Sequence, residues 1–182
     1  MHRAHYPSRK LKAGASALGG GRVLSIGFRV ARQLQTQWCW AAVSSSVSAY
    51  YPGGQSWPQC AVASAELGGR CCEAGSSFQC NQPWYLDNAL TRVGHLAYAF
   101  QGDVASSDVA DELNHDRPVA LRVGWSDGGH FLAIYGIQPG PRDDILYLTD
   151  PIYGESLIQR TALLGGGYQG SGRWTHSYLV SN

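Results

Sequence analysis

The sequence predicts an α+β fold in which a helical N-terminal half packs face to face against an antiparallel, strand-rich C-terminal half. Two observations lead to this class. Segments of the first half space their apolar residues as helices do, whereas beyond about residue 118 the chain becomes a series of short aromatic and β-branched runs between glycine-rich turns. Helices followed by strands in one chain are typical of two layers around a single core.

A strand and four helices are predicted up to residue 116. Residues 22–30 alternate as a strand does, and the small residues after Trp40 suit a closely packed helix that "YPGG" ends. A further helix opens with Pro83, a residue favoured in the first helical turn, and closes on a glycine. The predicted helices span residues 40–51, 58–67, 83–94 and 106–116.

Four strands are predicted in the second half. They are short runs rich in aromatic and β-branched residues, and the links "SDGG", "QPGPRD" and "GGGYQGSG" are typical of turns. Such links favour antiparallel pairing between neighbours. The predicted strands span residues 118–125, 130–137, 144–150 and 172–180.

The composition is that of one globular domain. Of the 182 residues, 44% are hydrophobic and 15% charged, and the chain is long enough to bury a substantial core. No apolar run approaches the roughly 18 residues that a membrane helix needs. We therefore expect a single domain over residues 22–182 without a membrane span.

Residues 1–21 differ in character from the rest. They lack apolar periodicity and end in three glycines, so we expect a flexible basic extension, either a solvated tail or a leader that is trimmed away. Residues 1–32 contain seven of the 14 basic side chains and no acidic one, which leaves a net charge of −6 on the remainder. That acidic remainder shows no basic stripe with interleaved aromatic residues, which argues against nucleic-acid binding.

One cysteine is placed as a reactive group would be. The segment "QTQWCWAAVSSSV" sets Cys39 between two tryptophans at the expected start of a helix. Unpaired N–H groups and the helix dipole at such a position favour the thiolate, the form of cysteine that attacks carbonyl carbons. A cysteine in a helix is also commonly a small buried hydrophobe, and this segment alone does not separate the two interpretations.

A nucleophilic cysteine needs a base, and His130 is the best candidate. It begins an apolar strand behind two glycines in "WSDGGHFLAIYG", where a substrate or another backbone can approach closely. Asp150 ends the next strand in "LYLTDPIYG", so adjacent antiparallel strands would bring its carboxylate beside the imidazole. Each could alone be an ordinary strand-end or turn residue. Their order after Cys39 predicts a nucleophile, a base and an orienting acid, with His176 as a weaker rival base.

The other four cysteines, Cys60, Cys71, Cys72 and Cys80, fall within 21 residues. The adjacent pair breaks the spacing usual for structural zinc, and no histidine lies inside the cluster, so we expect two disulfides and an oxidising compartment. Cys60 would pair with Cys71 or Cys72, and the remaining one of these with Cys80. A bond between the adjacent pair would be strained.

These motifs resemble those of a known family. "Q…WCWAA", then "GGHF.AIYG" about ninety residues later and "DP.YG" shortly after, are similar to the papain-like cysteine peptidases. The resemblance covers about residues 30–180 and is strongest to the bacterial group that includes avirulence-effector peptidases injected by plant pathogens, with staphopains more distant. It implies a papain-like two-layer fold with the active-site cleft between the halves. It also implies Cys39 as nucleophile, His130 as general base and acid, and Asp150 in the orienting place that papain gives to asparagine.

Papain-like enzymes also use a glutamine shortly before the nucleophile to stabilise the tetrahedral oxyanion. Gln33 lies six residues before Cys39 and matches the papain spacing, with Gln35 as second choice. A glutamine-rich approach to the helix could also be a plain polar loop.

The predicted function is a thiol endopeptidase that hydrolyses peptide bonds through an acyl-thioester intermediate. An acyltransferase of the transglutaminase-like or deamidating kind would use the same triad, and a non-catalytic binding module on this scaffold is the alternative from another class. We expect a protein or peptide substrate, no cofactor or metal, no nucleic-acid partner and a monomer. The resemblance and the cysteine cluster together imply a protein secreted or translocated out of a bacterial cell.

Overall fold

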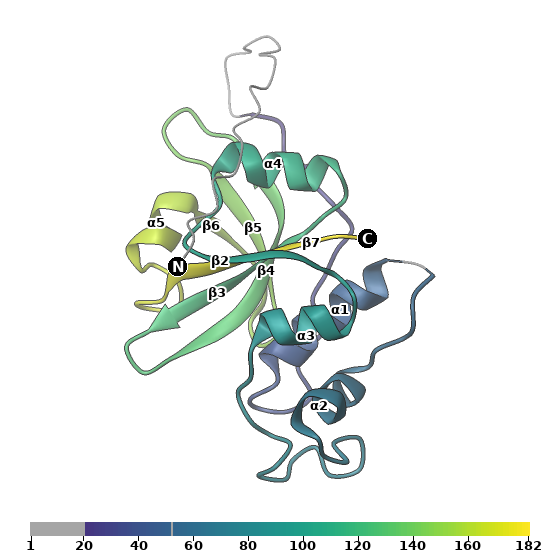
Figure 1. Ribbon diagram of the computed structural model, residues 1–182. Helices are drawn as coiled ribbons and strands as arrows, with labels where there is room; N and C mark the ends of the chain where they lie inside the picture. The colour runs from purple at the N-terminus through teal and green to yellow at the C-terminus, as the bar shows by residue number, and fades with distance from the viewer. Residues whose placement is uncertain (1–20, 52) are drawn as a thin grey trace.

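The computed structural model describes residues 21–51 and 53–182. The predicted flexible extension, residues 1–21, falls outside the described residues except for Gly21. The helices are α1 (Cys39–Tyr50), α2 (Gln59–Leu67), α3 (Leu86–Arg92), α4 (Ser106–Asn114) and α5 (Arg160–Gly165). In Figure 1, α1, α2 and α3 gather beside the sheet, and α4 lies above it. Helices therefore dominate the N-terminal half and strands the C-terminal half, as predicted.

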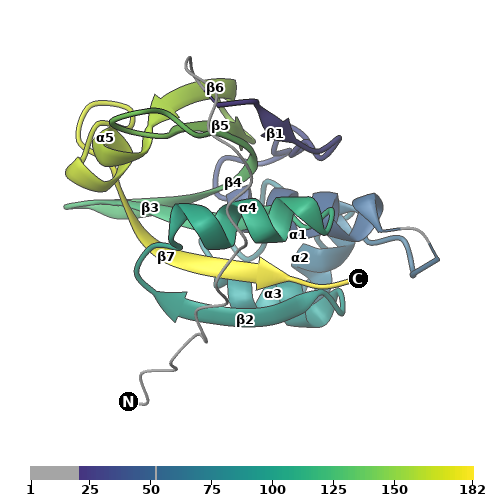
Figure 2. The same ribbon diagram turned by 90° about the horizontal axis from the view of Figure 1, so that it is seen from above.

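The strands form one antiparallel sheet. Its order is β2-β7-β3-β4-β5-β6, and β1 pairs with β4 outside this path. The strands are β1 (Leu24–Ser25), β2 (Leu96–Gln101), β3 (Val119–Trp125), β4 (Gly128–Gln138), β5 (Ile145–Asp150), β6 (Gly154–Gln159) and β7 (Arg173–Val180). Figure 2 shows the sheet curving from β2 to β6 with α4 against it. The long central strand β4 lies between β3 and β5; its first residues pair with β3, and its pairing with β5 begins at Ala133.

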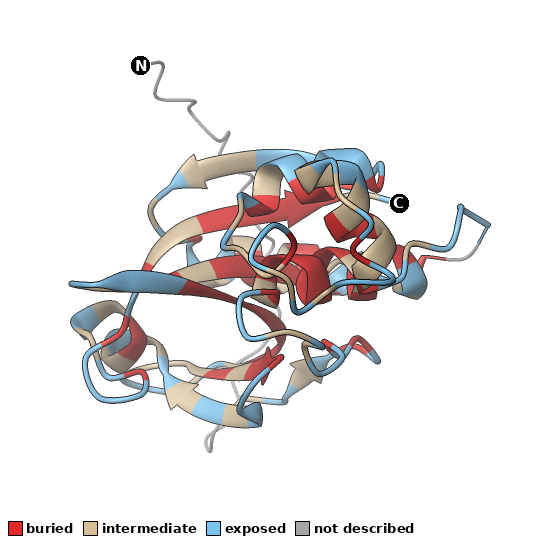
Figure 3. Cartoon of the chain, turned by 90° about the horizontal axis from the view of Figure 1, so that it is seen from below, coloured by how far each residue is buried: buried red, intermediate tan, exposed pale blue. Residues whose placement is uncertain are grey.

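α1 is the helix that joins the two layers. It packs against α2 and α3 on one side and against β4 on the other. Ala41, Ala42 and Ser44 are fully buried, and their small side chains allow this close approach. Figure 3 shows the buried stretches concentrated in α1 and in the central strands. The start of α1 is thereby held at a set position against the sheet. Among the described residues, no helix combines the length and apolar character that a bilayer crossing requires.

The predicted strand over residues 22–30 is wrong in length, because only Leu24 and Ser25 form β1. Beyond them the segment leaves the sheet for α1. The N–H of Val30 donates to Thr149 Oγ1 at 3.0 Å, and the N–H of Ala31 donates to Ser46 Oγ at 2.9 Å. Side chains of β5 and α1 therefore replace the partners that a strand would use.

The predicted helix over residues 83–94 is shorter than expected and does not begin at Pro83. Tyr85 has extended backbone angles, and α3 starts at Leu86.

Two strands and a helix were not predicted. β2 and β6 lie at the two edges of the sheet, and most of their residues are exposed or only partly buried, so neither shows the clean alternation of a half-buried strand. The helix α5 has only six residues, which is too short for a clear helical pattern.

Candidate active site

Cys39 is the first residue of α1, and its thiol is free because the other four cysteines are in disulfides. Cys39 is partly exposed, whereas Trp38 and Trp40 on either side are buried, with exposed fractions of 1% and 0%. The indoles fix the backbone while the thiol stays accessible. The first N–H groups of a helix have no acceptor within it, and the helix dipole is positive there, so this position favours an anion.

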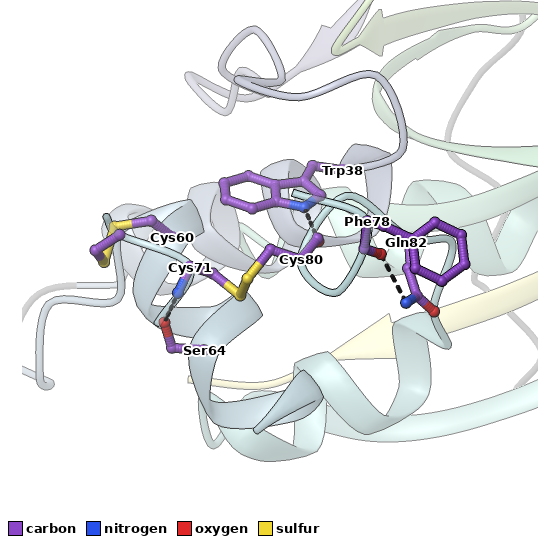
Figure 4. Close-up of a disulfide and its surroundings, with 8 residues drawn as sticks. Trp38, Cys60, Ser64, Cys71, Phe78, Cys80 and Gln82 are labelled. Atoms are coloured by element: carbon purple, nitrogen blue, oxygen red, sulfur yellow. Dashed lines mark hydrogen bonds between the residues drawn. A yellow bond between two sulfur atoms is a disulfide. The ribbon is translucent and has the colours of Figure 1, made fainter. Parts of the chain in front are cut away.

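A loop of residues 71–82, here called the anchor loop, holds both tryptophans. Trp38 Nε1 donates a 2.7 Å hydrogen bond to the carbonyl of Cys80, drawn in Figure 4, and Trp40 Nε1 donates to the carbonyl of Gln82 at 3.0 Å. Both indoles that flank the candidate nucleophile therefore bond to the same short stretch of chain.

A third residue of the anchor loop supports the turn before α1. Asn81 Oδ1 accepts the backbone N–H of Gln37 at 2.9 Å, and Asn81 Nδ2 donates to Thr36 Oγ1 at 2.8 Å. The chain on both sides of Cys39 is thus held by three consecutive residues of the anchor loop.

Two disulfides shape the anchor loop, as predicted. Cys60 in α2 bonds to Cys72, and Cys71 bonds to Cys80. This is one of the two pairings that the sequence left open. Ser64 Oγ accepts the N–H of Cys71 at 2.9 Å and ties the loop to α2 as well. Each disulfide typically stabilises a fold by about 2–4 kcal/mol.

His130 and Asp150 come from neighbouring strands. His130 lies near the start of β4 opposite Val123 of β3, and Asp150 is the last residue of β5. β4 and β5 pair through Ala133 and Thr149; continued by one residue, this register sets Asp150 opposite Leu132, so that His130, two residues earlier, lies on the same face in a diagonal position. The predicted neighbours are therefore brought together by the sheet.

The carboxylate of Asp150 is the centre of a hydrogen-bond network. His130 Nε2 lies 2.9 Å from both Oδ1 and Oδ2. Oδ1 also accepts the backbone N–H groups of Ile152 at 2.6 Å and Tyr153 at 3.0 Å, and Oδ2 accepts the hydroxyl of Tyr168 at 2.6 Å. His130 and Asp150 are buried, with exposed fractions of 8% and 2%. A buried carboxylate with this many donors is held in its ionised form.

His130 links Asp150 to Cys39. Its Nε2 bonds to the carboxylate, and the Cys39 side chain is near enough to the ring to affect its pKa. Burial lowers the pKa of His130, but the hydrogen bonds and charges of Asp150 and Cys39 outweigh it and raise the pKa from 6.5 to about 9. Burial raises the pKa of Asp150, but its bond to His130 and the further donors hold that pKa below its usual range. At neutral pH the imidazole is therefore protonated and the carboxylate ionised.

The two glutamines have different surroundings. Gln33 Nε2 donates to the carbonyls of Gln35 at 2.8 Å and Thr36 at 2.9 Å, and its buried Oε1 has no hydrogen-bond partner among the described residues. Gln35 Nε2 lies beside Gly75 of the anchor loop. Donation from Gln33 to an oxyanion therefore requires one of its two loop bonds to be exchanged.

A hollow of about 330 Å³ lies between the loop before α1 and the turn after β5. Leu34 and Ile152 at its wall have exposed fractions of 66% and 46%, so it offers apolar surface to a bound chain. Its lining residues are Arg32, Gln33, Leu34, Gln35, Thr36, Pro151 and Ile152.

Sequence reasoning missed three donors to Asp150. The N–H groups of Ile152 and Tyr153 form a turn closed by the aspartate side chain, and an aspartate followed by proline at a strand end is a usable signal for such a turn. Tyr168 comes from the link "GGGYQGSG", and no local pattern places its hydroxyl on a strand 18 residues away.

The rival base His176 lies opposite Arg122 of β3 and not beside Asp150. His176 lies in β7 with Nδ1 3.0 Å from Thr175 Oγ1, and burial, followed by the charge of Arg122, lowers its pKa. Among the described residues, no cluster of three or more His, Cys, Asp or Glu side chains could hold a metal ion.

Comparisons with known proteins bear on the family and the fold of the chain. Residues 24–162 match the family described as "Papain-like cysteine protease AvrRpt2". The peptidase domain of Streptococcus ComA, a bi-functional ABC transporter involved in a quorum sensing pathway, has a similar structure, with 16% identity and a TM-score of 0.54 over 85% of this chain and 99% of that domain. Digestive procathepsin L 3 of Tenebrio molitor larval midgut aligns with 11% identity and a TM-score of 0.41 over 87% of this chain and 69% of that one. The ComA similarity bears on the fold alone, and no curated protein sequence gives a significant match.

Proposed function

Because the chain belongs to the family of papain-like cysteine proteases described by AvrRpt2, we propose that it hydrolyses peptide bonds with Cys39, His130 and Asp150 as its triad. The resemblance inferred from the motifs is confirmed, and the protein is a cysteine peptidase with a papain-like fold. One observation supports the assignment of the triad above all others. The His130 imidazole is hydrogen-bonded to the buried carboxylate of Asp150, and Cys39, at a helix start, is near enough to help raise the pKa of the same imidazole.

In the first step the Cys39 thiolate attacks the carbonyl carbon of the scissile peptide bond. His130 carries the proton at neutral pH, as its raised pKa requires, and donates it to the leaving amine. The C–N bond breaks, the amine leaves, and the acyl group remains on the sulfur as a thioester.

In the second step His130, now neutral, takes a proton from water, and the resulting hydroxide attacks the thioester. The C–S bond breaks and Cys39 leaves as the thiolate, while the imidazole is again protonated. Asp150 keeps the imidazole in one orientation and stabilises its cation throughout.

The oxyanion formed in each step needs hydrogen-bond donors near the sulfur. The N–H of Cys39 at the start of α1 is one, and we assign the second to the side-chain amide of Gln33, with Gln35 as the alternative. Gln33→Ala should lower kcat by about 10²–10³-fold, and Gln35→Ala much less. A larger loss of kcat in Gln35→Ala than in Gln33→Ala would instead assign the second oxyanion donor to Gln35.

The substrate of a peptidase is a protein or peptide, and we propose that it binds along the hollow beside Leu34 and Ile152. The family and the two disulfides support export from a bacterial cell. The same triad would catalyse acyl transfer if an amine replaced water as the acceptor. It would catalyse deamidation if a side-chain amide replaced the peptide bond as the group attacked. Product masses from a peptide mixture with and without added amine distinguish these reactions.

The triad is tested by intact mass after incubation with an irreversible epoxide inhibitor of papain-like enzymes. We expect one adduct on the wild type, none on Cys39→Ala and a much slower one on His130→Ala. His176→Ala is the matched control and should react as the wild type does. An adduct that persists in Cys39→Ala, or no adduct on folded wild type, would contradict the proposed triad, the latter in favour of a binding module.

A further inference from the structure

The Asp150 carboxylate has one side-chain partner besides His130. Oδ1 is occupied by two backbone N–H groups of the following turn, and Oδ2 accepts the hydroxyl of Tyr168 at 2.6 Å. The distance is short, as expected for a hydroxyl that donates to an ionised oxygen. Tyr168 is buried, with an exposed fraction of 3%, so water does not compete strongly for this bond.

The position of Tyr168 is set by the glycine-rich link between α5 and β7. The N–H of Tyr168 donates to the carbonyl of Gly172 at 3.0 Å, and the N–H of Gly172 donates back at 2.8 Å, which closes a tight loop. Gly172 lies against Val123 and Trp125 of β3, where a side chain would collide with both. Trp125 also contacts the Tyr168 ring, with centroids 6.4 Å apart. The link is therefore pinned to the sheet and presents one buried side chain, aimed at Asp150.

Tyr168 also lies outside residues 24–162, the part of the chain that matches the family. Neither the family match nor the motifs around Cys39, His130 and Asp150 account for it. Its hydroxyl nevertheless completes the set of donors around the one carboxylate that orients the base.

We propose that Tyr168 is a positioning residue of the peptidase, which holds Asp150 ionised and oriented so that His130 stays aligned with Cys39. This inference rests on the proposed function of the triad. The hydroxyl of Tyr168 bonds to Asp150 rather than to Cys39 or His130, so Tyr168 acts through Asp150.

The effect follows from the charge of the partner. A hydrogen bond to an ionised carboxylate favours the ionised form, so the Tyr168 hydroxyl contributes to the lowered pKa of Asp150. Tyr168 itself keeps its proton, because burial and the Asp150 charge raise its pKa. The titratable groups that face Asp150 are Tyr168, His130 from β4, Cys39 from α1, and Tyr153 from the turn after β5, whose ring lies against His130.

Without the hydroxyl, Asp150 would bind a proton at a higher pH. A protonated Asp150 no longer stabilises the imidazolium of His130, so at that higher pH Cys39 would lose the partner that activates it. The acidic limb of Cys39 reactivity therefore reports on the Tyr168 hydroxyl, and it can be measured without knowing the natural substrate.

The experiment is the pH dependence of Cys39 alkylation by iodoacetamide, followed by intact mass, in the wild type and in Tyr168→Phe. Cys39 is the free cysteine, so a single adduct is measured. We expect the acidic limb to move up by about one pH unit, and the rate on that limb to fall about tenfold, as loss of a hydrogen bond to a charged group predicts. Above the limb the two rates should be within about twofold.

Tyr135→Phe is the matched control. Tyr135 is also a buried tyrosine whose hydroxyl donates to a carboxylate, at 2.8 Å to Glu155 Oε2, but the other side-chain partner of Glu155 is Arg29 rather than a triad residue. The acidic limb of Cys39 alkylation in Tyr135→Phe should coincide with that of the wild type. Two results would overturn the inference: Tyr168→Phe could alkylate more slowly by the same factor at every pH, or its pH profile could match that of the wild type. Neither result would contradict the proposed triad. A wild-type thiol with no enhanced reactivity contradicts the proposed function and this inference with it.

Discussion

The segment that carries Cys39 and the strands that carry His130 and Asp150 are held in place by different interactions. Cys39 depends on the anchor loop, whose shape is set by two disulfides and whose residues bond to the tryptophans on either side of the thiol. His130 and Asp150 depend on strand pairing and on donors to a buried carboxylate. The nucleophile side should therefore respond to reduction and the base side to pH, and each can be disturbed without the other.

The largest effect is expected on the base side. Asp150→Ala removes the acceptor for the imidazole and leaves several buried donors unpaired, so the rate of epoxide inactivation should fall by about 10²-fold or more. Asp150→Asn keeps one acceptor oxygen, as papain-like enzymes with asparagine do, and should lose about tenfold. Second-order inactivation rates measure both. Equal rates for the two variants would show that orientation by an acceptor oxygen does not matter.

On the nucleophile side, the two disulfides provide a matched pair. Cys71→Ala with Cys80→Ala frees the chain that accepts the Trp38 bond, whereas Cys60→Ala with Cys72→Ala breaks the more distant link to α2. Both double variants should lose about 2–4 kcal/mol of unfolding free energy in urea. The first should also alkylate Cys39 about tenfold more slowly, and the second within about twofold of the wild type. Equal alkylation rates in the two variants would contradict the inference that the anchor loop positions Cys39.

The pH response should belong to the base side. His130 has a pKa raised from 6.5 to about 9, so its contribution to stability is fully present below about pH 6.5 and is lost as pH rises through about 9. The contribution amounts to about 3 kcal/mol. Urea unfolding between pH 6 and 10 should show the wild type losing this advantage over His130→Gln. Parallel curves for the two proteins would contradict a raised His130 pKa.

Much of the site could be predicted because its signals are local. Cys39 between tryptophans, His130 behind two glycines and Asp150 before a proline each mark a strand end or a helix start, and the order of those elements brings them together. The fold class followed from the change of hydrophobic period. The short strand β1 was misjudged because Val30 finds its partner in a side chain of β5, which alternation cannot reveal.

The features that the sequence did not predict depend on tertiary contacts. Cys71 and Cys72 are adjacent, so spacing cannot decide which of them faces α2 and which faces Cys80. Tyr168 reaches Asp150 only because the link before β7 is pinned against β3, a contact that no local pattern encodes. β2 pairs with β7 near the end of the chain, and its half-exposed residues show neither face clearly.

The smallest effect should come from the polar part of the anchor loop. Asn81→Ala removes the acceptor for the Gln37 N–H and the donor to Thr36, but all three groups lie near solvent, where water replaces much of each bond. We expect alkylation of Cys39 to slow by about two- to threefold and unfolding free energy to fall by about 1 kcal/mol. Asn88→Ala, an exposed asparagine on α3, is the control and should change neither quantity. If Asn81→Ala slowed alkylation as much as loss of the Cys71–Cys80 disulfide, the nucleophile would be positioned by these polar contacts, and the contrast between a covalently supported side and a hydrogen-bonded side would fail.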